Sequence, residues 1–199
     1  MDVMKILLAS QNRNKAEEFR ELLRGLPVEL LTLEAFPQVG PIEEDAPTLE
    51  GNALKKAREV FRQTGIPALA DDTGLEVRYL NDAPGVFSSR FAGPGATYAE
   101  NVRKLLQTMR GVPPRRRGAR FRAVLAFIPA AGREEIAEGI VNGVILESPR
   151  GAGGFGYDPV FLPHGHSRTY AEMDLAEKNQ VSHRARAMER MKEILGTYV

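Results

Sequence analysis

Short apolar runs alternate along the chain with segments in which apolar residues recur every three or four positions. The runs 5–10 (KILLAS) and 28–33 (VELLTL) have the length of buried strands. Between them, Phe19, Leu22 and Leu23 recur at helical spacing before Gly25, which favours the end of a helix. A strand, a helix and a second strand in close succession predict an α/β architecture.

The same periodicities continue to the end of the chain. Residues 37–47 contain three prolines and an acidic cluster, which is typical of a loop. Helices are predicted at about 48–64, 97–111 and 182–195. Two strand candidates, 67–72 and 75–80, flank Thr73-Gly74. The strands 119–130 and 135–146 are predicted to form a hairpin. No linker separates these segments, so we expect one domain, 1–199, with room for two lobes.

Composition narrows the class of protein. Hydrophobic residues make up 43% and charged residues 27% of the 199 positions, as in ordinary globular proteins. The formal net charge of +1 provides no general attraction to nucleic acid or membrane, and no apolar run reaches membrane-spanning length. Without cysteine, thiolate metal sites and cysteine nucleophiles are excluded. We therefore expect a cytoplasmic protein.

Two polar segments near the N-terminus suit a phosphorylated ligand. Ser10, Asn12 and Lys15 lie between a strand and a helix, where backbone N–H groups favour an anion; alternatively they cap the helix and Lys15 is solvated. Glu43 and Glu44 lie in the acidic loop, whose oxygen ligands suit Mg²⁺, although a solvated loop is the simpler interpretation.

Two lysines of the second helix differ in their relation to its apolar stripe. Lys56 lies at the border of the stripe, whereas Lys55 lies opposite it. Lysines at such borders commonly bury only their stems. Lys56 is still the better candidate to reach a ligand.

Asp71 and Asp72 are adjacent acids at the end of a predicted strand. Neighbouring side chains on a strand point to opposite faces, so one carboxylate can be structural and the other catalytic. A divalent cation nearby would keep either of them ionised. The alternative is an Asx-type turn before Gly74.

Two segments in the C-terminal part could contact a nucleobase. Residues 151–161 contain a formal G-x-G-x-x-G, but no helix is predicted after it, which excludes a dinucleotide fold; Phe155 remains free to stack on a base. The predicted start of the last helix carries a polar group of residues, Lys178, Ser182, His183 and Arg184. Cations at this end of a helix oppose the helix dipole, and a bound anion or electron-rich base edge would explain their placement. A solvated start capped by Ser182 is the alternative.

Other basic residues carry less information. Arg115, Arg116 and Arg117 follow two prolines without interleaved aromatics, so a solvated loop is favoured over a nucleic-acid site. With only three histidines, His164, His166 and His183, a three-histidine zinc site is improbable.

Taken in order, these motifs resemble the inosine-triphosphate pyrophosphatase family, which hydrolyses ITP, dITP and XTP to the monophosphate and pyrophosphate. The resemblance spans nearly the whole chain and rests on 10–15 (SQNRNK), Glu44, Asn52, Lys56, 71–75 (DDTGL), 83–85 (APG), 88–90 (SSR), 155–159 (FGYDP), Lys178 and 182–184 (SHR). Ser10 and Thr73 stand where threonine and serine are frequent in the family, and both substitutions keep the hydroxyl.

The resemblance implies an α/β fold with a long mixed sheet and two lobes around a central cleft. It also implies Mg²⁺ as cofactor and a homodimer, with the APG segment near the interface. Metal-assisted attack of water on the α-phosphorus is mostly positioning and charge neutralisation. The chemistry thus implied is hydrolysis of non-standard nucleotides in the nucleotide pool.

The resemblance assigns unequal roles to the matching residues. Asp72 is the expected catalytic residue and, with Glu44, the metal ligand. The expected substrate-binding residues are Ser10, Gln11, Asn12, Arg13, Asn14, Lys15, Lys56, Thr73, Phe155, Gly156, Tyr157, Asp158, Lys178, His183 and Arg184. Asp71 is expected to support the site.

Two rivals come from different classes. The related Maf-type pyrophosphatases act on pyrimidine or methylated nucleotides, but their usual opening has serine and arginine where this chain has Asn12 and Lys15. A nucleic-acid-binding module would use 115–117, which the near-neutral charge opposes.

Overall fold

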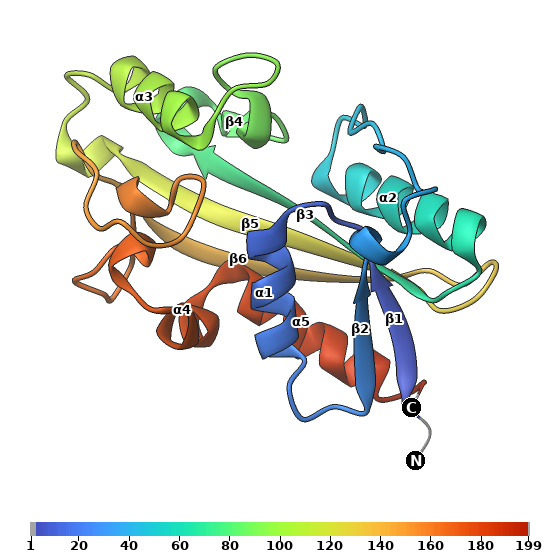
Figure 1. Cartoon of the computed structure of the whole chain (residues 1–199). Coiled ribbons are helices and arrows are strands. Elements are labelled where there is room, and N and C mark those ends of the chain that lie inside the picture. Colours follow the sequence, from blue (N-terminus) through green and yellow to red (C-terminus); the bar gives the residue numbers. More distant parts are fainter. Residues whose placement is uncertain (1–2, 199) are drawn as a thin grey trace. The chain divides into compact units, whose positions relative to one another are not determined.

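The computed structural model describes residues 3–198, and these form an α/β fold as predicted (Figure 1). The helices are α1 (Arg13–Leu22), α2 (Leu49–Thr64), α3 (Tyr98–Thr108), α4 (Leu175–Val181) and α5 (His183–Leu195). The strands are β1 (Met4–Leu8), β2 (Val28–Thr32), β3 (Ala68–Val77), β4 (Pro84–Gly85), β5 (Gly118–Ile128), β6 (Glu135–Ile145) and β7 (Phe161–Pro163). Among these described residues, no helix is both long enough and apolar enough to span a bilayer.

The strands form one mixed seven-stranded sheet. Its order is β2-β1-β3-β5-β6-β7, and β4 pairs with β3. β1 is parallel to β2 and to β3, whereas β4 and β7 are antiparallel to their neighbours. The expected mixed sheet is therefore confirmed.

The chain divides into two compact units. The first contains residues 1–72, 123–139 and 184–199, and the second contains 73–122 and 140–183. Strands β3, β5 and β6 contribute residues to both. Each unit has its own hydrophobic core.

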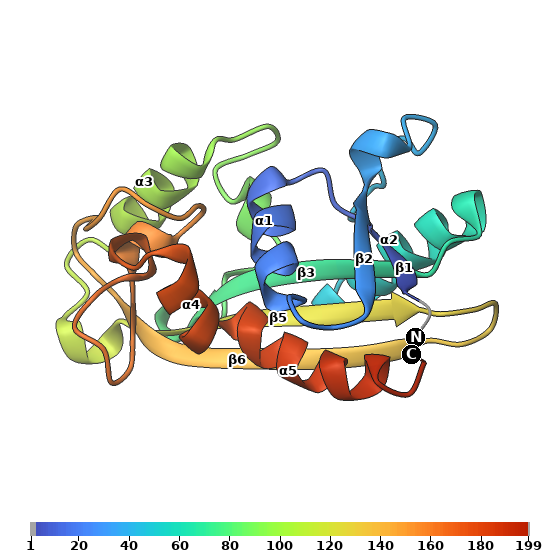
Figure 2. The same cartoon turned by 60° about the horizontal axis from the view of Figure 1, so that its bottom comes forward.

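In the first unit, α1 and α5 cover one face of the sheet (Figure 2). Phe19 of α1 and Met188 of α5 pack with Leu8 of β1 and Leu69 of β3 in one cluster. Leu7 and Ala68, which alternate with these strand residues, point to the other face and are also fully buried. That second face is the one on which Lys56 of α2 lies, as its contacts described below show.

In the second unit, α3 packs through Val102, Leu105 and the C-cap residue Met109, which recur at helical spacing within the predicted helix 97–111. They contact a cluster that includes Phe121 of β5 and Tyr170. The capping box of Thr97 and Glu100 fixes the start of α3. Through these contacts α3 is packed against the sheet.

The structure corrects three local predictions. Residues 73–74 are not a turn, because β3 runs continuously through them, and a Cβ on Gly74 would lie 2.7 Å from the Gly85 carbonyl oxygen. Lys178 is not at the start of the last helix but in the separate helix α4, which has its own capping box. The hairpin strands and the remaining helices lie where the periodicity predicts them.

The third correction concerns Arg117, which is buried rather than part of a solvated loop. Its guanidinium donates to the carbonyl oxygens of Ile145 (2.7 Å), Leu146 (2.8 Å) and Met109 (3.0 Å). Arg117 therefore ties the end of α3 to the end of β6. Arg115 and Arg116 remain exposed.

Candidate functional site

The two adjacent aspartates of β3 point to opposite faces of the strand. The Asp71 carboxylate contacts Lys15 of α1 and Arg184 of α5, whereas the Asp72 carboxylate contacts Lys56 of α2. Both lie within a continuous strand, so the alternative of an Asx turn is excluded. The alternation expected from the sequence thus gives each acid its own surroundings.

Asp71 is held in a buried charge cluster. Arg184 Nε donates to Asp71 Oδ2 at 3.0 Å, and Arg184 Nη1 also pairs with Glu18 of α1. The side chains of all three are at most 3% exposed. Burial opposes ionisation, but the positive charges of Arg184, Lys15 and Lys56 outweigh it and hold the pKa of Asp71 well below its usual range.

Asp72 belongs to a different cluster, centred on the Lys56 ammonium. Lys56 Nζ lies 2.5 Å from Glu44 Oε1, 3.3 Å from Asp72 Oδ1 and 2.7 Å from the Asp71 carbonyl oxygen. Burial of Lys56 opposes its charge, but Asp72, Glu44 and Asp71 more than compensate and raise its pKa. Lys56 is only 7% exposed, so it reaches inward as its place on the stripe predicted.

The second carboxylate oxygen of Asp72 is buried without a hydrogen-bond partner. Burial raises the pKa of Asp72, and the nearby charges of Lys56 and Lys15 lower it only in part. A buried, unsatisfied carboxylate oxygen is costly unless a ligand completes it.

The residues present fit a divalent metal that shares its ligands with a substrate. Glu44 and Asp72 converge on one ammonium, and Asp72 has an oxygen to spare. The described residues contain no group of three or more His, Asp or Glu side chains arranged to hold a metal alone. Mg²⁺ commonly takes one or two carboxylates and completes its shell with water and phosphate oxygens, which this donor set matches.

The start of α1 presents backbone N–H groups and polar side chains. Asn12 is the N-cap, with Oδ1 accepting from the N–H groups of Asn14 (3.0 Å) and Lys15 (3.3 Å). The capping alternative is therefore confirmed for Asn12. Lys15 is not solvated, because its ammonium pairs with Asp71.

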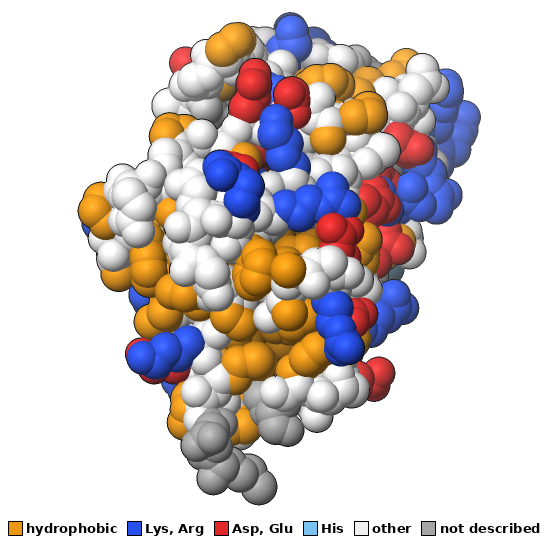
Figure 3. Space-filling view, turned by 90° about the vertical axis from the view of Figure 1, so that its right-hand side faces the viewer, with side chains coloured by type: hydrophobic (Ala, Val, Ile, Leu, Met, Phe, Trp, Pro, Cys, Tyr) orange, Lys and Arg blue, Asp and Glu red, His pale blue; other side chains and the backbone are white. Residues whose placement is uncertain are grey.

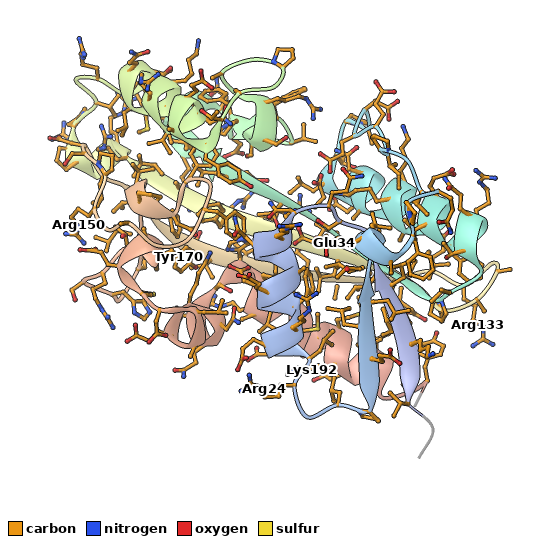
Figure 4. All side chains as sticks on the ribbon, in the orientation of Figure 1. Arg24, Glu34, Arg133, Arg150, Tyr170 and Lys192 are labelled. Carbon is orange, nitrogen blue, oxygen red and sulfur yellow. The ribbon has the colours of Figure 1, made fainter. Side chains whose placement is uncertain are left out.

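Ser10, Gln11 and Arg13 of this segment line a hollow of about 310 Å³, whereas Asn14 does not. Gln11, Arg13 and Asn14 are exposed, and Ser10 is half-buried. Arg13 Nε donates to Glu34, labelled in Figure 4, at 2.9 Å. A phosphate-binding role for these side chains stays a prediction.

In the second unit, Asp158 and Lys178 form a buried pair among aromatic rings. Lys178 Nζ lies 2.6 Å from Asp158 Oδ2, and the same oxygen accepts the backbone N–H of Phe155 at 2.9 Å. The ammonium lies 4.6 Å from the ring centre of Phe155 and 5.6 Å from that of Tyr170 (labelled in Figure 4). The glycine at 154 is required, because a Cβ there would collide with the Asp158 carboxylate.

Other predicted residues of this unit are held by the protein itself. Tyr157 is buried and donates through its hydroxyl to the Ser88 carbonyl oxygen at 2.9 Å, and burial raises its pKa. His183 stacks on Phe121 at 4.5 Å between ring centres. Gly156 has a φ of 63°, and Thr73 is half-buried on β3.

Two residues with a place in these clusters were missed by the sequence argument. Glu18 binds Arg184, and its position one turn after Lys15, beside Phe19, could have marked it as a buried acid. Tyr170 contacts both Lys178 and Phe161, but nothing in its local sequence distinguishes it from an ordinary core tyrosine. The fold is what brings these residues to the site.

The family model, the sequence relatives and the solved structures that match this chain agree with one another. The model of the Ham1 family matches residues 6–194. A dITP/XTP pyrophosphatase of Geobacter sulfurreducens is 46% identical over 192 residues, 96% of each chain. The structure of a HAM1 protein from Coxiella burnetii has a TM-score of 0.88 at 44% identity, covering 98% of this chain and 99% of that one. The Staphylococcus aureus Ham1 protein has a TM-score of 0.86 at 29% identity, covering 98% and 100%.

Proposed function

The chain belongs to the Ham1 family, and we propose that it hydrolyses the non-standard purine nucleoside triphosphates ITP, dITP and XTP to the monophosphate and pyrophosphate. The observation that carries this proposal is the Lys56 ammonium, bound to both Glu44 and Asp72 beside an unsatisfied Asp72 oxygen. An ammonium and two carboxylates at such close range suit a phosphate bound together with a divalent metal. The relative from Geobacter sulfurreducens is named a dITP/XTP pyrophosphatase.

Mg²⁺ is the metal we propose, with Glu44 and Asp72 as its ligands. When bound, Mg²⁺ neutralises phosphate charge and polarises the phosphorus toward attack. Lys56 and Lys15 supply positive charge to the triphosphate, and Ser10 to Asn14 supply hydroxyl, amide and backbone donors at the start of α1. The spread of these donors suits the several oxygens of a triphosphate.

Asp72 has the atom needed to accept a proton from the attacking water. Its Oδ2 is buried and without a partner, while Oδ1 is fixed by Lys56. A carboxylate held on one oxygen keeps the other in a defined direction. We assign to Asp72 Oδ2 the orientation and deprotonation of water, and to Thr73 a hydrogen bond to the substrate.

The base is assigned to the second unit. Phe155 offers a ring for stacking, and Asp158 and Lys178 contact it. His183 lies 6.1 Å from the ring of Tyr170, which the Lys178 ammonium also faces, and Gly156 and Tyr157 follow Phe155 in the chain. Donors at the base edge favour a 6-oxo group over the 6-amino group of adenine. Where the unpaired groups are buried, such a mismatch can discriminate by ~10⁴-fold.

Arg184 differs from the other members of the base-reading set, because Asp71 and Glu18 bind its guanidinium. We retain it as a substrate-binding residue because it belongs to the matching segment 182–184. A role for Arg184 in base reading predicts that Arg184→Lys lowers the preference for dITP over dATP. Unchanged preference in that variant would remove Arg184 from the set.

Incubation with Mg²⁺ and a panel of nucleoside triphosphates tests the proposed function. We expect pyrophosphate and the monophosphate from ITP, dITP and XTP, slow reaction with ATP and dATP, and no reaction after chelation of the metal. Release of orthophosphate would contradict the proposal. Pyrophosphate release with a preference for pyrimidine or methylated nucleotides would favour a Maf-type activity.

Neither stable nucleic-acid binding nor membrane binding is part of the proposal. The face drawn in Figure 3 carries acidic and basic side chains interspersed with hydrophobic ones, so that face offers no field of one sign. Tight binding of the protein to single-stranded or duplex DNA in moderate salt would oppose this view. We place the activity in the cytoplasm, with the nucleotide pool.

We further propose a homodimer whose interface includes the region after the APG segment. Phe87 is 57% exposed in the second unit, and Arg90 lies 5.2 Å from its ring centre. Exposed aromatic and arginine side chains are enriched at interfaces. Sedimentation of wild type and Phe87→Glu tests the dimer, which the charge is expected to weaken.

A further inference from the structure

Tyr98 is an exposed aromatic residue in a rigid position. It is the first residue of α3, directly after the N-cap Thr97. Thr97 N–H donates to Glu100 Oε2 at 2.7 Å, and Glu100 N–H donates to Thr97 Oγ1 at 3.3 Å, which closes the capping box. The backbone under Tyr98 is therefore fixed, while 43% of the residue remains exposed.

The ring of Tyr98 lies beside that of Phe155. Their centres are 5.9 Å apart, and their planes are inclined by 42°. Phe155 is fixed in turn, because its N–H is bound by Asp158 and the Lys178 ammonium lies over its ring. Lys178 and Tyr98 therefore both border the Phe155 ring.

We propose that Tyr98 is a second aromatic wall of the base-binding site, beside Phe155. This inference rests on the proposed function, in which Phe155 stacks on a purine. Two rings inclined by 42° form a wedge rather than a closed stack, so a flat bicyclic base on Phe155 meets the Tyr98 ring as well. Tyr98 then adds to the affinity for the nucleoside and has no part in the chemistry at phosphorus.

The geometry distinguishes Tyr98 from the other strongly exposed tyrosine of the same unit. Tyr79 is 41% exposed, and its ring is covered by the Arg116 guanidinium at 4.7 Å. Tyr79 therefore resembles Tyr98 in exposure and in residue type but has no contact with Phe155 among the interactions of its ring. It provides the matched control.

Steady-state kinetics with ITP tests the proposal. Removing one aromatic contact from a stacked base typically costs about tenfold in binding, so Tyr98→Ala should raise KM for ITP by about tenfold and leave kcat within about twofold. Tyr98→Phe retains the ring and should recover most of that loss. Tyr79→Ala should behave as wild type.

A second probe separates the base from the phosphates. Inorganic triphosphate has no base, so its inhibition constant should be the same for wild type and Tyr98→Ala. An equal loss of affinity for inorganic triphosphate and ITP would overturn the proposal, because the effect would then not concern the base. So would a KM for ITP that changes less than about twofold in Tyr98→Ala.

Binding can also be followed without turnover. The chain has no tryptophan and five tyrosines, so tyrosine emission is measurable directly. Addition of IMP should change the emission of wild type and of Tyr79→Phe, and most of the change should be absent in Tyr98→Phe. An undiminished change in Tyr98→Phe would count against the assignment. Failure of wild type to hydrolyse ITP would instead reject the proposed function, independently of the IMP titration.

Discussion

Two buried lysine–aspartate pairs, Lys56–Asp72 in the first unit and Lys178–Asp158 in the second, differ in their surroundings. Lys56 shares its ammonium with a second acid, Glu44, and one Asp72 oxygen has no partner. Lys178 pairs with Asp158, whose Oδ2 also accepts a backbone N–H, and two aromatic rings lie around the ammonium. The first pair thus contains a buried oxygen without a hydrogen-bond partner, whereas the second lies among aromatic rings.

The difference matches the roles proposed for the two units, phosphate binding in the first and base binding in the second. One ammonium against two carboxylates leaves negative charge, which a bound divalent metal would balance while it binds phosphate oxygens. Aromatic rings around a buried ion pair offer a flat face for a neutral base.

The largest expected effect is that of Asp72→Asn on turnover. The amide keeps the shape of the side chain but cannot accept the proton of water, and general-base catalysis is typically worth 10²–10⁴-fold. We expect kcat for ITP to fall by about 10³-fold, measured as pyrophosphate release. Asp45→Asn, in the acidic loop next to Glu44 but in an exposed pair with Lys55, is the control and should leave kcat unchanged. Near-normal turnover in Asp72→Asn would show that the first pair is structural.

The next largest effect concerns stability. Arg184→Ala removes the buried guanidinium that pairs with both the Asp71 and Glu18 carboxylates and leaves Lys15 beside Asp71; breaking a buried pair typically costs about 3–5 kcal/mol in the free energy of unfolding. Urea unfolding measures it. Arg58→Ala removes an exposed pair with Glu134 and should cost no more than about 1 kcal/mol. Equal decreases in the free energy of unfolding in the two variants would mean that burial does not make the Asp71 cluster more stabilising than an exposed ion pair.

Much of the first unit could be predicted from periodicity alone. The border position of Lys56 on the α2 stripe identified the inward-pointing lysine, and strand alternation separated Asp71 from Asp72. Both predictions depend on residues close in sequence within one regular element. Regular elements make side-chain direction a local property.

The features that sequence did not predict depend on distant partners. Arg117 looks like one member of a basic loop, but its acceptors come from the end of α3 and the end of β6. Tyr98 and Phe155 meet only through the packing of the second unit. The helix α4 is short, yet its capping residues Asp174 and Glu177 stand three apart in the sequence and could have marked it.

A smaller effect is expected from Lys178→Met, which tests whether the second pair reads the base. Methionine keeps the length of the side chain and removes the donor from Asp158 and from any 6-oxo group. We expect the ratio of kcat/KM for dITP to that for dATP to fall by about 10²-fold, short of the limit for fully buried mismatches. Lys192→Met, in α5 of the first unit, is the control. An unchanged ratio with reduced stability would make Lys178–Asp158 a purely structural pair.

The smallest effect concerns the loop that carries Glu44. Asn52 of α2 is buried, its Oδ1 accepts the Ala46 N–H at 2.9 Å, and its Nδ2 is buried without a partner. Asn52→Ala removes the anchor of this loop, which should lower the free energy of unfolding by about 1 kcal/mol. Because Glu44 is then less well positioned, the Mg²⁺ concentration for half-maximal activity should rise severalfold while KM for ITP at saturating Mg²⁺ stays close to wild type. Gln63→Ala, at the exposed end of the same helix, should change neither quantity. If the Mg²⁺ concentration for half-maximal activity is unaltered in Asn52→Ala, the loop that carries Glu44 does not position a metal ligand. Of the two proposed ligands, Asp72 would then remain.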